Sequence, residues 1–179
     1  PFSEWTGWEM PDPVFWCPAG YAVISADCRA TNESEGEHFA HFDPQMCRDI
    51  HDMVEWIAEQ DWCDGNVGMN GVSYLAATQW MGASENPPHL KAIIPWEGFN
   101  DFYREHVAHG GMPDTNFFRE IWGRRMNSET GFIAKGATVE DVVAEQKARP
   151  LMDDYWRSKH PDLTKITVPT YAVASWATA

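Results

Sequence analysis

The chain is 179 residues long and carries 27 acidic side chains against 13 basic ones, which gives a formal net charge of −14. This charge argues against nucleic acid, anionic membrane surfaces and acidic polymers as partners, because each of them would be repelled. Hydrophobic residues make up 44% of the chain and charged residues 22%, the balance of a globular protein with a domain-sized core. No apolar run approaches the roughly 20 residues of a membrane-spanning helix.

Cysteine and histidine positions bear on redox state and metal binding. No two cysteines have the short C-x-x-C spacing of a zinc or redox site, and all have apolar or strand-like neighbours. We therefore expect buried thiols, which favours a reducing, cytoplasmic compartment. Two histidine pairs are spaced three apart without a third ligand, so we expect no metal site. These residues are Cys17, Cys28, Cys47 and Cys63, and the pairs His38/His41 and His106/His109.

The first 41 residues predict one strand between two irregular segments. Residues 1–18 are rich in tryptophan and phenylalanine and are interrupted by prolines, which predicts an irregular segment packed through its aromatic rings. Residues 20–27 form a nearly continuous apolar run after a glycine, which is typical of a strand buried on both faces of a parallel sheet. The polar residues 30–41 then predict a loop at the carboxyl end of that strand.

A helix is predicted over residues 44–59. Asp43 is a typical N-cap, and Pro44 suits the first helical position. Apolar residues recur at intervals of three and four along this stretch, as on one face of an amphipathic helix. A turn over residues 61–65 leads into the next strand, so a βαβ unit is expected.

A serine joins this next strand to a second helix within residues 66–76. Gly71 opens a turn, Ser73 follows two positions later, and a helix-forming run over residues 74–84 begins directly after it. This is the layout of a nucleophile elbow, in which the first amide of the helix, that of Tyr74, faces a developing oxyanion. The same layout is also typical of a serine that only caps the helix, and Gly-x-Ser alone does not decide between the two.

Another strand is predicted over residues 90–95, which makes the fold an α/β protein with a mainly parallel sheet. Ligands bind beyond the carboxyl ends of the strands in such sheets. Asp27, Ser73 and Glu97 are therefore predicted at one rim of the sheet.

The pattern changes over residues 100–161, where short helices and a glycine-rich loop replace the alternation of strand and helix. Such a stretch is too long for a simple crossover, so we interpret it as a helical cap inserted over the rim. The predicted domains are a central α/β segment over 1–99, the cap over 100–161 and a returning core strand within 162–179. The predicted elements of the second half are a loop at 109–113, helices at 117–126, 138–149 and 152–159, and a buried strand at 165–176.

Short motifs are spread along the whole chain. They are Pro11-Asp12-Pro13, Gly20-Tyr21-Ala22-Val23, Asp27-x-Arg29, Ser34-x-Gly36, Glu55-Trp56, Trp62-Cys63-x-Gly65-x-Val67-Gly68-Met69, Gly71-x-Ser73-Tyr74, Pro87-Pro88-His89-Leu90-Lys91-Ala92-Ile93, Pro95-Trp96-Glu97-Gly98, Tyr103-Arg104, His109-Gly110-Gly111 and Ile166-Thr167-Val168-Pro169. With these motifs the sequence resembles the cocaine esterase and X-Pro dipeptidyl-peptidase-like (CocE/NonD) family of α/β-hydrolases. The likeness runs from about Trp8 to Trp176 in the family's order.

The resemblance implies an α/β-hydrolase-type fold with a helical cap, represented here by its central part. It also implies cleavage of a small ester or a short peptide through an acyl-enzyme, with a Ser-His-Asp triad and no cofactor. Ser73 would be the nucleophile, and the Tyr74 backbone amide would be one oxyanion donor. The oligomeric state, including a homo-oligomer, is left open.

The same resemblance indicates what this chain does not carry. The family's second oxyanion donor is a tyrosine on a loop that would precede Pro1, and Thr178 occupies the expected position of the acid. The histidine would follow on a later segment, so the isolated chain is expected to be inactive or nearly so. The rival interpretation is a truncated or degenerate hydrolase-fold module that binds or supports without catalysis, and Thr178 favours it. Ala30, Asn32 and Ala76 also replace glycines that are usual in the family.

Four further residues or groups of residues have an expected role. His109 belongs to the cap loop, where a structural or substrate-lining role is expected rather than that of the base. Glu97 either orients a histidine or belongs to a structural turn. Asp27 and Arg29 are expected to pair and fix the loop after their strand. The large aromatic residues are expected in the core, with one or two lining an acyl pocket; they are Trp96, Phe99, Trp122 and Trp156.

Overall fold

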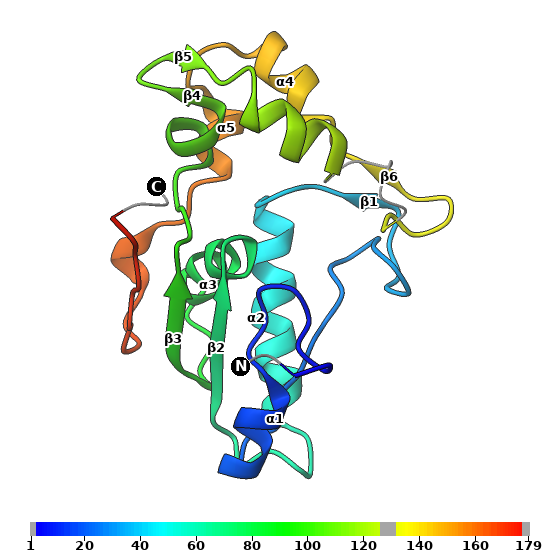
Figure 1. Cartoon of the computed structure of the whole chain (residues 1–179), viewed down its shortest axis with the longest axis vertical. Coiled ribbons are helices and arrows are strands. Elements are labelled where there is room, and N and C mark those ends of the chain that lie inside the picture. The colour runs from blue at the N-terminus through cyan, green and yellow to red at the C-terminus, as the bar shows by residue number, and fades with distance from the viewer. Residues whose placement is uncertain (1–2, 126–131, 177–179) are drawn as a thin grey trace. The chain divides into compact units, whose positions relative to one another are not determined.

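The computed structural model describes residues 3–125 and 132–176, which fall into two compact units (Figure 1). Unit 1 lies within Pro1–Ser25, Cys47–Asn100 and Asp162–Ala179, and unit 2 comprises Ala26–Met46 and Asp101–Pro161. No helix in the described stretches has the length and apolarity needed to cross a bilayer.

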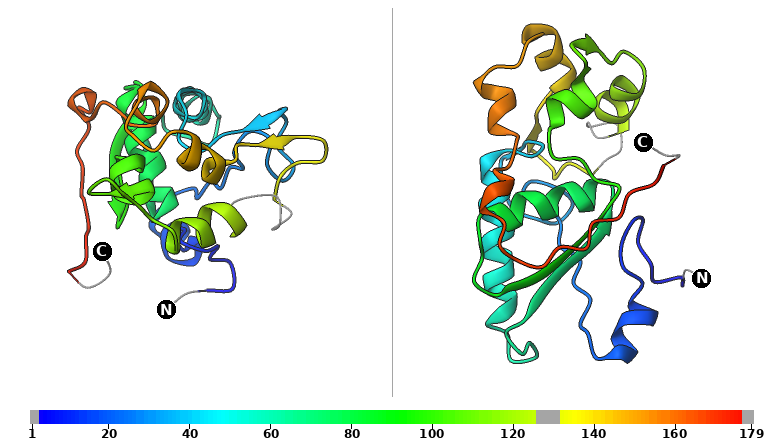
Figure 2. Two further views of the ribbon diagram at one scale, coloured as in Figure 1. Left: turned by 90° about the horizontal axis from the view of Figure 1, so that it is seen from above. Right: turned by 90° about the vertical axis from the view of Figure 1, so that its left-hand side faces the viewer.

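Unit 1 is built on the predicted strand, helix and strand. Strands β2 (Val67–Val72) and β3 (Leu90–Trp96) pair in parallel, in a register that runs from Val67 opposite Leu90 to Val72 opposite Trp96. Helix α3 (Tyr74–Ser84) connects them and packs across both strands (Figure 2). The carboxyl ends of β2 and β3 therefore lie at one edge, with the start of α3.

Helix α2 (Pro44–Ala58) confirms the predicted amphipathic helix, and the Asp43 carboxylate accepts a hydrogen bond from the Met46 amide at 2.8 Å, as expected of an N-cap. Within unit 1 this helix approaches α3 closely, because a Cβ placed on Gly82 would lie 2.3 Å from Ile50 Cγ2. Aliphatic residues of the two helices and of β2 and β3 form one core. Its buried members are Val54, Ile57, Val67, Ala83, Leu90 and Ile93.

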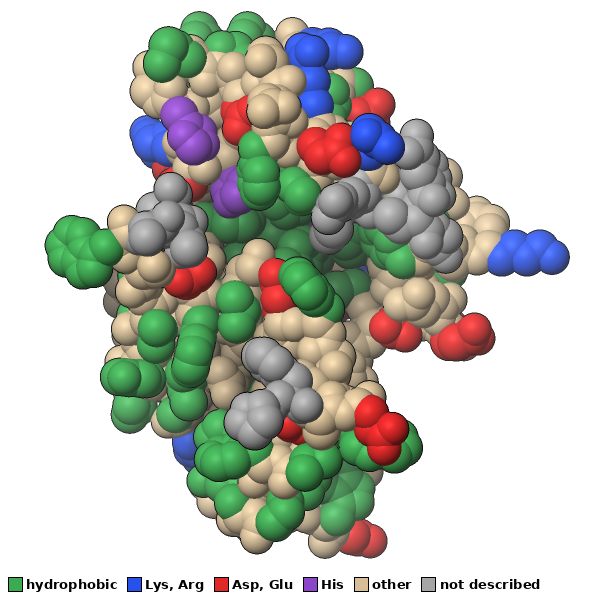
Figure 3. All heavy atoms as spheres, viewed as in Figure 1, with side chains coloured by type: hydrophobic (Ala, Val, Ile, Leu, Met, Phe, Trp, Pro, Cys, Tyr) green, Lys and Arg blue, Asp and Glu red, His purple; other side chains and the backbone are tan. Residues whose placement is uncertain are grey.

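The N-terminal segment differs from the prediction. It contains a short helix, α1 (Pro13–Trp16), whose N-cap Asp12 accepts from the Val14 amide at 3.0 Å, followed by a 3-10 turn over Cys17–Ala19. The rings of Phe15 and Tyr21 pack edge to face on Trp16, whereas Trp5 and Trp8 stay exposed, 70% and 88% accessible. In the space-filling view, hydrophobic side chains lie on the surface at the end of unit 1 that carries α1 (Figure 3).

The strand predicted over residues 20–27 is wrong, because this run has no regular strand structure and is largely exposed. An apolar run becomes a strand only when a neighbour completes its hydrogen-bond ladder. Within the described residues, no ladder to this run is formed.

The buried strand predicted over residues 165–176 does not form as a regular strand. The stretch that was predicted as a strand follows β3 in parallel through two isolated bridges, Ile93 to Thr170 and Trp96 to Val173. The Val173 amide donates to the Pro95 carbonyl at 3.0 Å, so this stretch is hydrogen-bonded to β3 through its backbone. Most side chains on this stretch are exposed, since it lies at the edge of the sheet.

Unit 2 has short elements around an aromatic core. Within its described residues, β1 (His38–Phe39) pairs in parallel with β6 (Thr138–Val139), and β4 (Ala108–His109) pairs antiparallel with β5 (Met112–Pro113). The helical parts of the same residues include the π-helices Tyr103–Val107 and Arg119–Arg125 and the helices α4 (Val142–Ala148) and α5 (Asp154–Ser158). The buried aromatic residues include Phe39, Phe42, Phe102, Tyr103, Phe118, Trp122 and Trp156.

Several expectations for the second half need correction. The loop at 109–113 is the turn of the β4–β5 hairpin, and Gly110 and Gly111 have the positive φ of 59° and 84° that such a turn requires. The helix predicted from Thr138 begins instead at Val142, because Asp141 is its N-cap and accepts from the Ala144 amide at 2.9 Å. The helix predicted over 117–126 is the second π-helix, and Met126 lies outside the described residues. The helix predicted over 152–159 is α5.

Candidate active site

Ser73 sits between β2 and α3 in a strained backbone conformation, with φ 58° and ψ −113°. Such a conformation costs a side-chain-bearing residue about 1–3 kcal/mol and is held only where the surroundings enforce it. Here the Ser73 amide donates to the Trp96 carbonyl at 2.9 Å, and its carbonyl accepts from the Ala76 and Ala77 amides at 3.0 Å. The backbone is therefore fixed on both sides of the serine.

The Ser73 hydroxyl makes no side-chain cap hydrogen bond to α3. The alternative that this serine is only a helix cap is therefore wrong. The strain of a positive φ without a capping bond is what a nucleophile elbow requires, because the turn presents the hydroxyl rather than using it for the helix.

Close packing explains the glycine before the serine. A Cβ placed on Gly71 would lie 2.5 Å from the Leu75 Cβ, a distance that real Cβ atoms do not adopt. The backbone of Gly98, after β3, lies equally close to α3, since a Cβ placed on Gly98 would lie 2.5 Å from the Ala76 Cβ. The methyl of Ala76, where the family usually has glycine, is thus accommodated against Gly98, which follows β3.

The buried side chain of Gln79 holds the elbow to the sheet. Its Nε2 donates to the carbonyls of Leu75 at 2.9 Å and Gly71 at 3.4 Å, and its Oε1 accepts from the Ile94 amide at 2.9 Å. The side chain is 1% exposed. This role is not predictable from the sequence, because a single glutamine in a helical run gives no signal for burial.

Glu9 is the second residue that the sequence analysis missed. Its carboxylate accepts hydrogen bonds from the Trp8 indole, the Ser73 hydroxyl and the Tyr74 backbone amide. Burial raises the pKa of this carboxyl group above its ordinary value, and the three hydrogen bonds offset this only in part. The chain separation of 64 residues leaves no local pattern that would have revealed the contact.

The two histidines of unit 1 have other partners. His89 Nδ1 lies 2.7 Å from Glu55 Oε2, and His51 Nδ1 lies 3.1 Å from Asp52 Oδ1. The His89 carbonyl accepts from the Val67 amide, which places it at the amino end of β2. Ser73 follows the opposite end of that strand, about 20 Å away at ~3.3 Å per residue. His89 is therefore not the base for Ser73.

Of the other predicted rim residues, Glu97 follows β3 directly, is exposed and has φ 51°, while its amide donates to the Val173 carbonyl at 2.8 Å. This geometry favours the structural turn for Glu97. Asp27 belongs to unit 2, where its carboxylate accepts from Asn32 Nδ2 at 2.8 Å. Its predicted place on a shared strand edge is wrong, since that strand does not form. The pairing of Asp27 with Arg29 stays a prediction.

In the loop after Asp27, two residues that are not glycine adopt backbone conformations typical of glycine. Ala30 and Asn32, at positions where the resemblance leads one to expect glycine, have φ values of 60° and 46°. Glycine populates this region without steric cost, whereas alanine is strained there. This loop therefore keeps its glycine-type backbone despite the substitutions.

In unit 2, His109 is exposed in the β4–β5 hairpin, and His106 is half-buried next to the aromatic rings of Phe117 and Trp122. Burial first, and then the charge of His109, lower the pKa of His106 to about 4, while Asp114 acts in the opposite direction. Trp122 and Trp156 are core residues, as expected, whereas Trp96 is 42% exposed.

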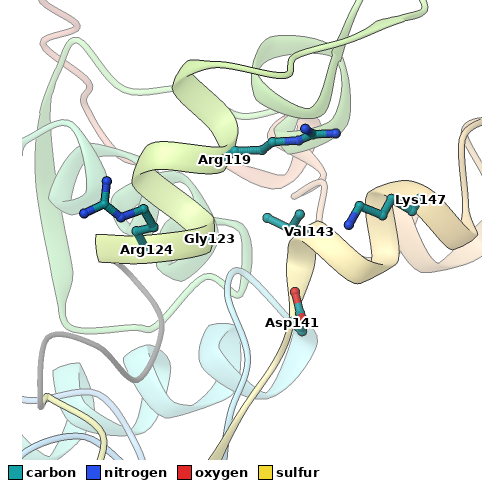
Figure 4. A pocket seen from close by; sticks show the side chains of 6 residues that line it. All are labelled: Arg119, Gly123, Arg124, Asp141, Val143 and Lys147. Carbon is teal, nitrogen blue, oxygen red and sulfur yellow. The ribbon is translucent and has the colours of Figure 1, made fainter.

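A basic hollow of about 360 Å³ lies between the second π-helix and α4 in unit 2 (Figure 4). Its lining includes Arg119, Arg124 and Lys147, but Arg124 is paired with Glu120 at 2.9 Å, and Asp141 caps α4. None of its lining residues is the serine or its neighbours. Among the described residues, no three of His, Cys, Asp or Glu are grouped to hold a metal ion.

The thiols are less buried than expected. Cys47 is buried, Cys28 and Cys63 are half-buried, and Cys17 is exposed. The compartment therefore stays a prediction. Thr178, at the expected position of the acid, lies outside the described residues.

Comparison with known proteins decides the family of this chain. The model of the X-Pro dipeptidyl-peptidase (S15 family) matches residues 2–178. The chain belongs to the S15 family. The relatives of this S15 chain include cocaine esterase of Rhodococcus sp. (strain MB1 Bresler), 51% identical over 147 residues, which cover 75% of this chain and 25% of the relative. They also include Xaa-Pro dipeptidyl-peptidase of Lactobacillus delbrueckii subsp. lactis, 31% identical over 111 residues, covering 55% of this chain and 14% of the relative.

Solved structures agree with this assignment. A CocE/NonD family hydrolase from Staphylococcus aureus superposes with a TM-score of 0.88 and 43% identity, covering 94% of this chain and 30% of that one. An α-amino acid ester hydrolase matches with a TM-score of 0.62 at 19% identity, which shows the fold alone. The S15 chain thus has part of an α/β-hydrolase fold, and it spans between 14% and 30% of the length of these relatives.

Proposed function

We propose that this S15 chain carries the nucleophile of a serine hydrolase that cleaves an ester or amide through an acyl-enzyme on Ser73. The observation that supports this most is the strained φ of 58° at Ser73, with a hydroxyl that does not cap α3. The names of the relatives, an esterase and a dipeptidyl-peptidase, support a small ester or a short peptide as substrate.

In the proposed reaction, the Ser73 Oγ attacks the substrate carbonyl and its proton passes to a base. The Tyr74 backbone amide, the first of α3, donates a hydrogen bond to the oxyanion of the tetrahedral intermediate, which is also stabilised by the positive end of the helix. Collapse of the intermediate expels the alcohol or amine, and water then hydrolyses the acyl-serine. Each oxyanion donor typically contributes about 3–4 kcal/mol to the transition state.

The base is not assigned to a described residue. The two unit 1 histidines are paired with Glu55 and Asp52, and the resemblance indicates that the triad histidine, the acid and the second oxyanion donor come from other parts of the protein. A serine without its base retains only weak catalysis. We therefore propose that the 179-residue chain alone is inactive or nearly so.

Hydrolysis of a chromogenic ester by the full-length protein that contains this chain tests the proposal. We expect Ser73→Ala to lower kcat by several orders of magnitude, and Ser84→Ala, on the same helix, to leave it nearly unchanged. The 179-residue chain itself should show no hydrolysis above background. Equal turnover by Ser73→Ala would contradict the catalytic role of Ser73, and no turnover by the wild-type protein would favour the non-catalytic module. Ser73-dependent turnover by the isolated chain would contradict its inactivity alone.

A further inference from the structure

The backbone of Glu9 is anchored beside the elbow. The Glu9 carbonyl accepts a hydrogen bond from the Val72 amide at 3.1 Å, and it would lie 3.5 Å from a Cβ placed on Gly71. Glu9 also has a positive φ of 65°, so this residue departs from ordinary extended backbone at the point where it meets β2. The position of its side chain is therefore set by contacts to the two residues that precede Ser73.

The carboxylate of Glu9 accepts hydrogen bonds from the two groups that the proposed reaction needs. The Ser73 hydroxyl and the Tyr74 backbone amide both donate to it, and the Trp8 indole adds a third hydrogen bond. An amide has one hydrogen, so a Tyr74 amide that donates to a carboxylate is not available to an oxyanion. A negative carboxylate at this place also repels the negative charge that develops on the intermediate.

We propose that the ionised side chain of Glu9 competes with the substrate carbonyl for the Tyr74 amide and thereby restrains Ser73, so that acyl transfer needs this side chain to be protonated or turned away. This inference rests on the proposed function of Ser73. It also sets a preference among substrates, because an acyl group that carries a carboxylate would meet a second carboxylate beside the nucleophile. Neutral or cationic acyl groups are expected to react faster.

The direction of the pH dependence follows from the surroundings of Glu9. The groups that act on its carboxylate are the Trp8 indole, the Ser73 hydroxyl and the Tyr74 amide, all of them neutral near pH 7. Burial raises the pKa of Glu9 above 4.5, so the carboxyl stays protonated to a higher pH than an exposed glutamate. The restraint is absent below that pKa and becomes complete as the pH rises through it.

The rate of Ser73 labelling by a neutral fluorophosphonate tests this in the full-length protein between about pH 4 and pH 8. The quantity of interest is the labelling rate of Glu9→Gln and of Glu9→Ala, each divided by the wild-type rate at the same pH. This ratio cancels the titration of the catalytic base. We expect it to be near one at the acid end and to rise several-fold through the pKa of Glu9, more for alanine, which leaves no acceptor. Glu4→Gln, on the same segment and exposed, should give a ratio of one throughout.

A ratio for the Glu9 variants that stays at one, or falls as the pH rises, would overturn the inference. A fall would mean that Glu9 assists Ser73 instead of restraining it. Absence of labelling at Ser73 in the wild type would instead contradict the proposed function.

A second measurement on the 179-residue chain does not depend on reactivity. The amide proton of Tyr74, followed by NMR, should shift with the titration of Glu9, and this shift should vanish in Glu9→Gln. A Tyr74 amide resonance that does not respond to the titration of Glu9 would overturn the inference even where labelling fails.

Discussion

The two units of this chain are stabilised by different kinds of buried side chains. Unit 1 buries aliphatic side chains between helices and a parallel strand pair, with Ile93 0% and Val54 1% exposed. Unit 2 buries aromatic rings together with polar and charged groups, such as Lys159 at 1% exposure. Apolar packing does not depend on pH, whereas a buried charge or imidazole does. The proposed nucleophile, Ser73, belongs to the unit whose packing is insensitive to pH, and unit 2 is expected to respond to acid and to loss of single polar partners.

The largest expected effect is at the buried ion pair of unit 2. Lys159 Nζ lies 2.7 Å from Glu140 and also donates to the His41 carbonyl, while the Tyr155 hydroxyl donates to Glu140 at 2.6 Å. Replacing Glu140 by glutamine leaves the lysine charge without its counter-ion and should lower the free energy of unfolding of unit 2 by about 3–5 kcal/mol.

Urea unfolding followed by tryptophan fluorescence measures this change. Glu145→Gln removes one of the two carboxylate partners of an exposed arginine, Arg149, which also pairs with Asp153, and is the matched control with little expected effect. Equal losses in the free energy of unfolding for the two variants would show that the buried pair contributes no more to the stability of unit 2 than an exposed one.

A smaller effect is expected from His106. Its pKa falls from 6.5 to about 4 on folding, so the folded state binds fewer protons than the unfolded chain in this interval. The free energy of unfolding of unit 2 should therefore fall as the pH drops from 6.5 to about 4, by about 3 kcal/mol from this residue, and change no further below that.

The pH dependence of urea unfolding, compared between wild type and His106→Gln, isolates this contribution. The variant should lose most of the acid sensitivity in this interval, and His109→Gln, in the exposed hairpin, should keep it. An unchanged slope in His106→Gln would assign the acid sensitivity of unit 2 to other groups.

The smallest of the three effects is expected in unit 1, at Gly71. A methyl at this position would lie 2.5 Å from the Leu75 Cβ, so β2 and α3 must separate, at a cost of about 1–3 kcal/mol. Gly68→Ala, on the same strand, is the control, because its Cβ would meet the Ala92 carbonyl at an ordinary 3.6 Å. Thermal unfolding should rank Gly71→Ala well below Gly68→Ala and the wild type. Equal stabilities would show that the elbow is not closely packed.

The same contrast explains what the sequence could and could not predict. Helices α2 and α3 and strands β2 and β3 follow from local signals, such as Asp43 before Pro44 and the periodicity after it. The elbow at Ser73 follows from the same kind of local signal. The Asp12-Pro13 pair carries the N-cap signal too and would have predicted α1.

The remainder depends on residues that are distant in the chain. The run over 20–27 has the composition of a buried strand, but composition does not supply the neighbouring strand that a ladder requires. The buried partners Lys159 and Glu140, and the contact of Glu9 with Ser73, join positions with no shared periodicity. Gln79 looks like an ordinary polar helix residue until three backbone groups are seen around it.

The central claim is that Ser73 is an activated nucleophile, and covalent labelling of the full-length protein tests it most directly. After reaction with a fluorophosphonate, peptide mapping by mass spectrometry should locate a single adduct on Ser73, and Ser73→Ala should carry none. An unlabelled Ser73 in the folded full-length protein, or an adduct that persists in Ser73→Ala, would contradict the claim.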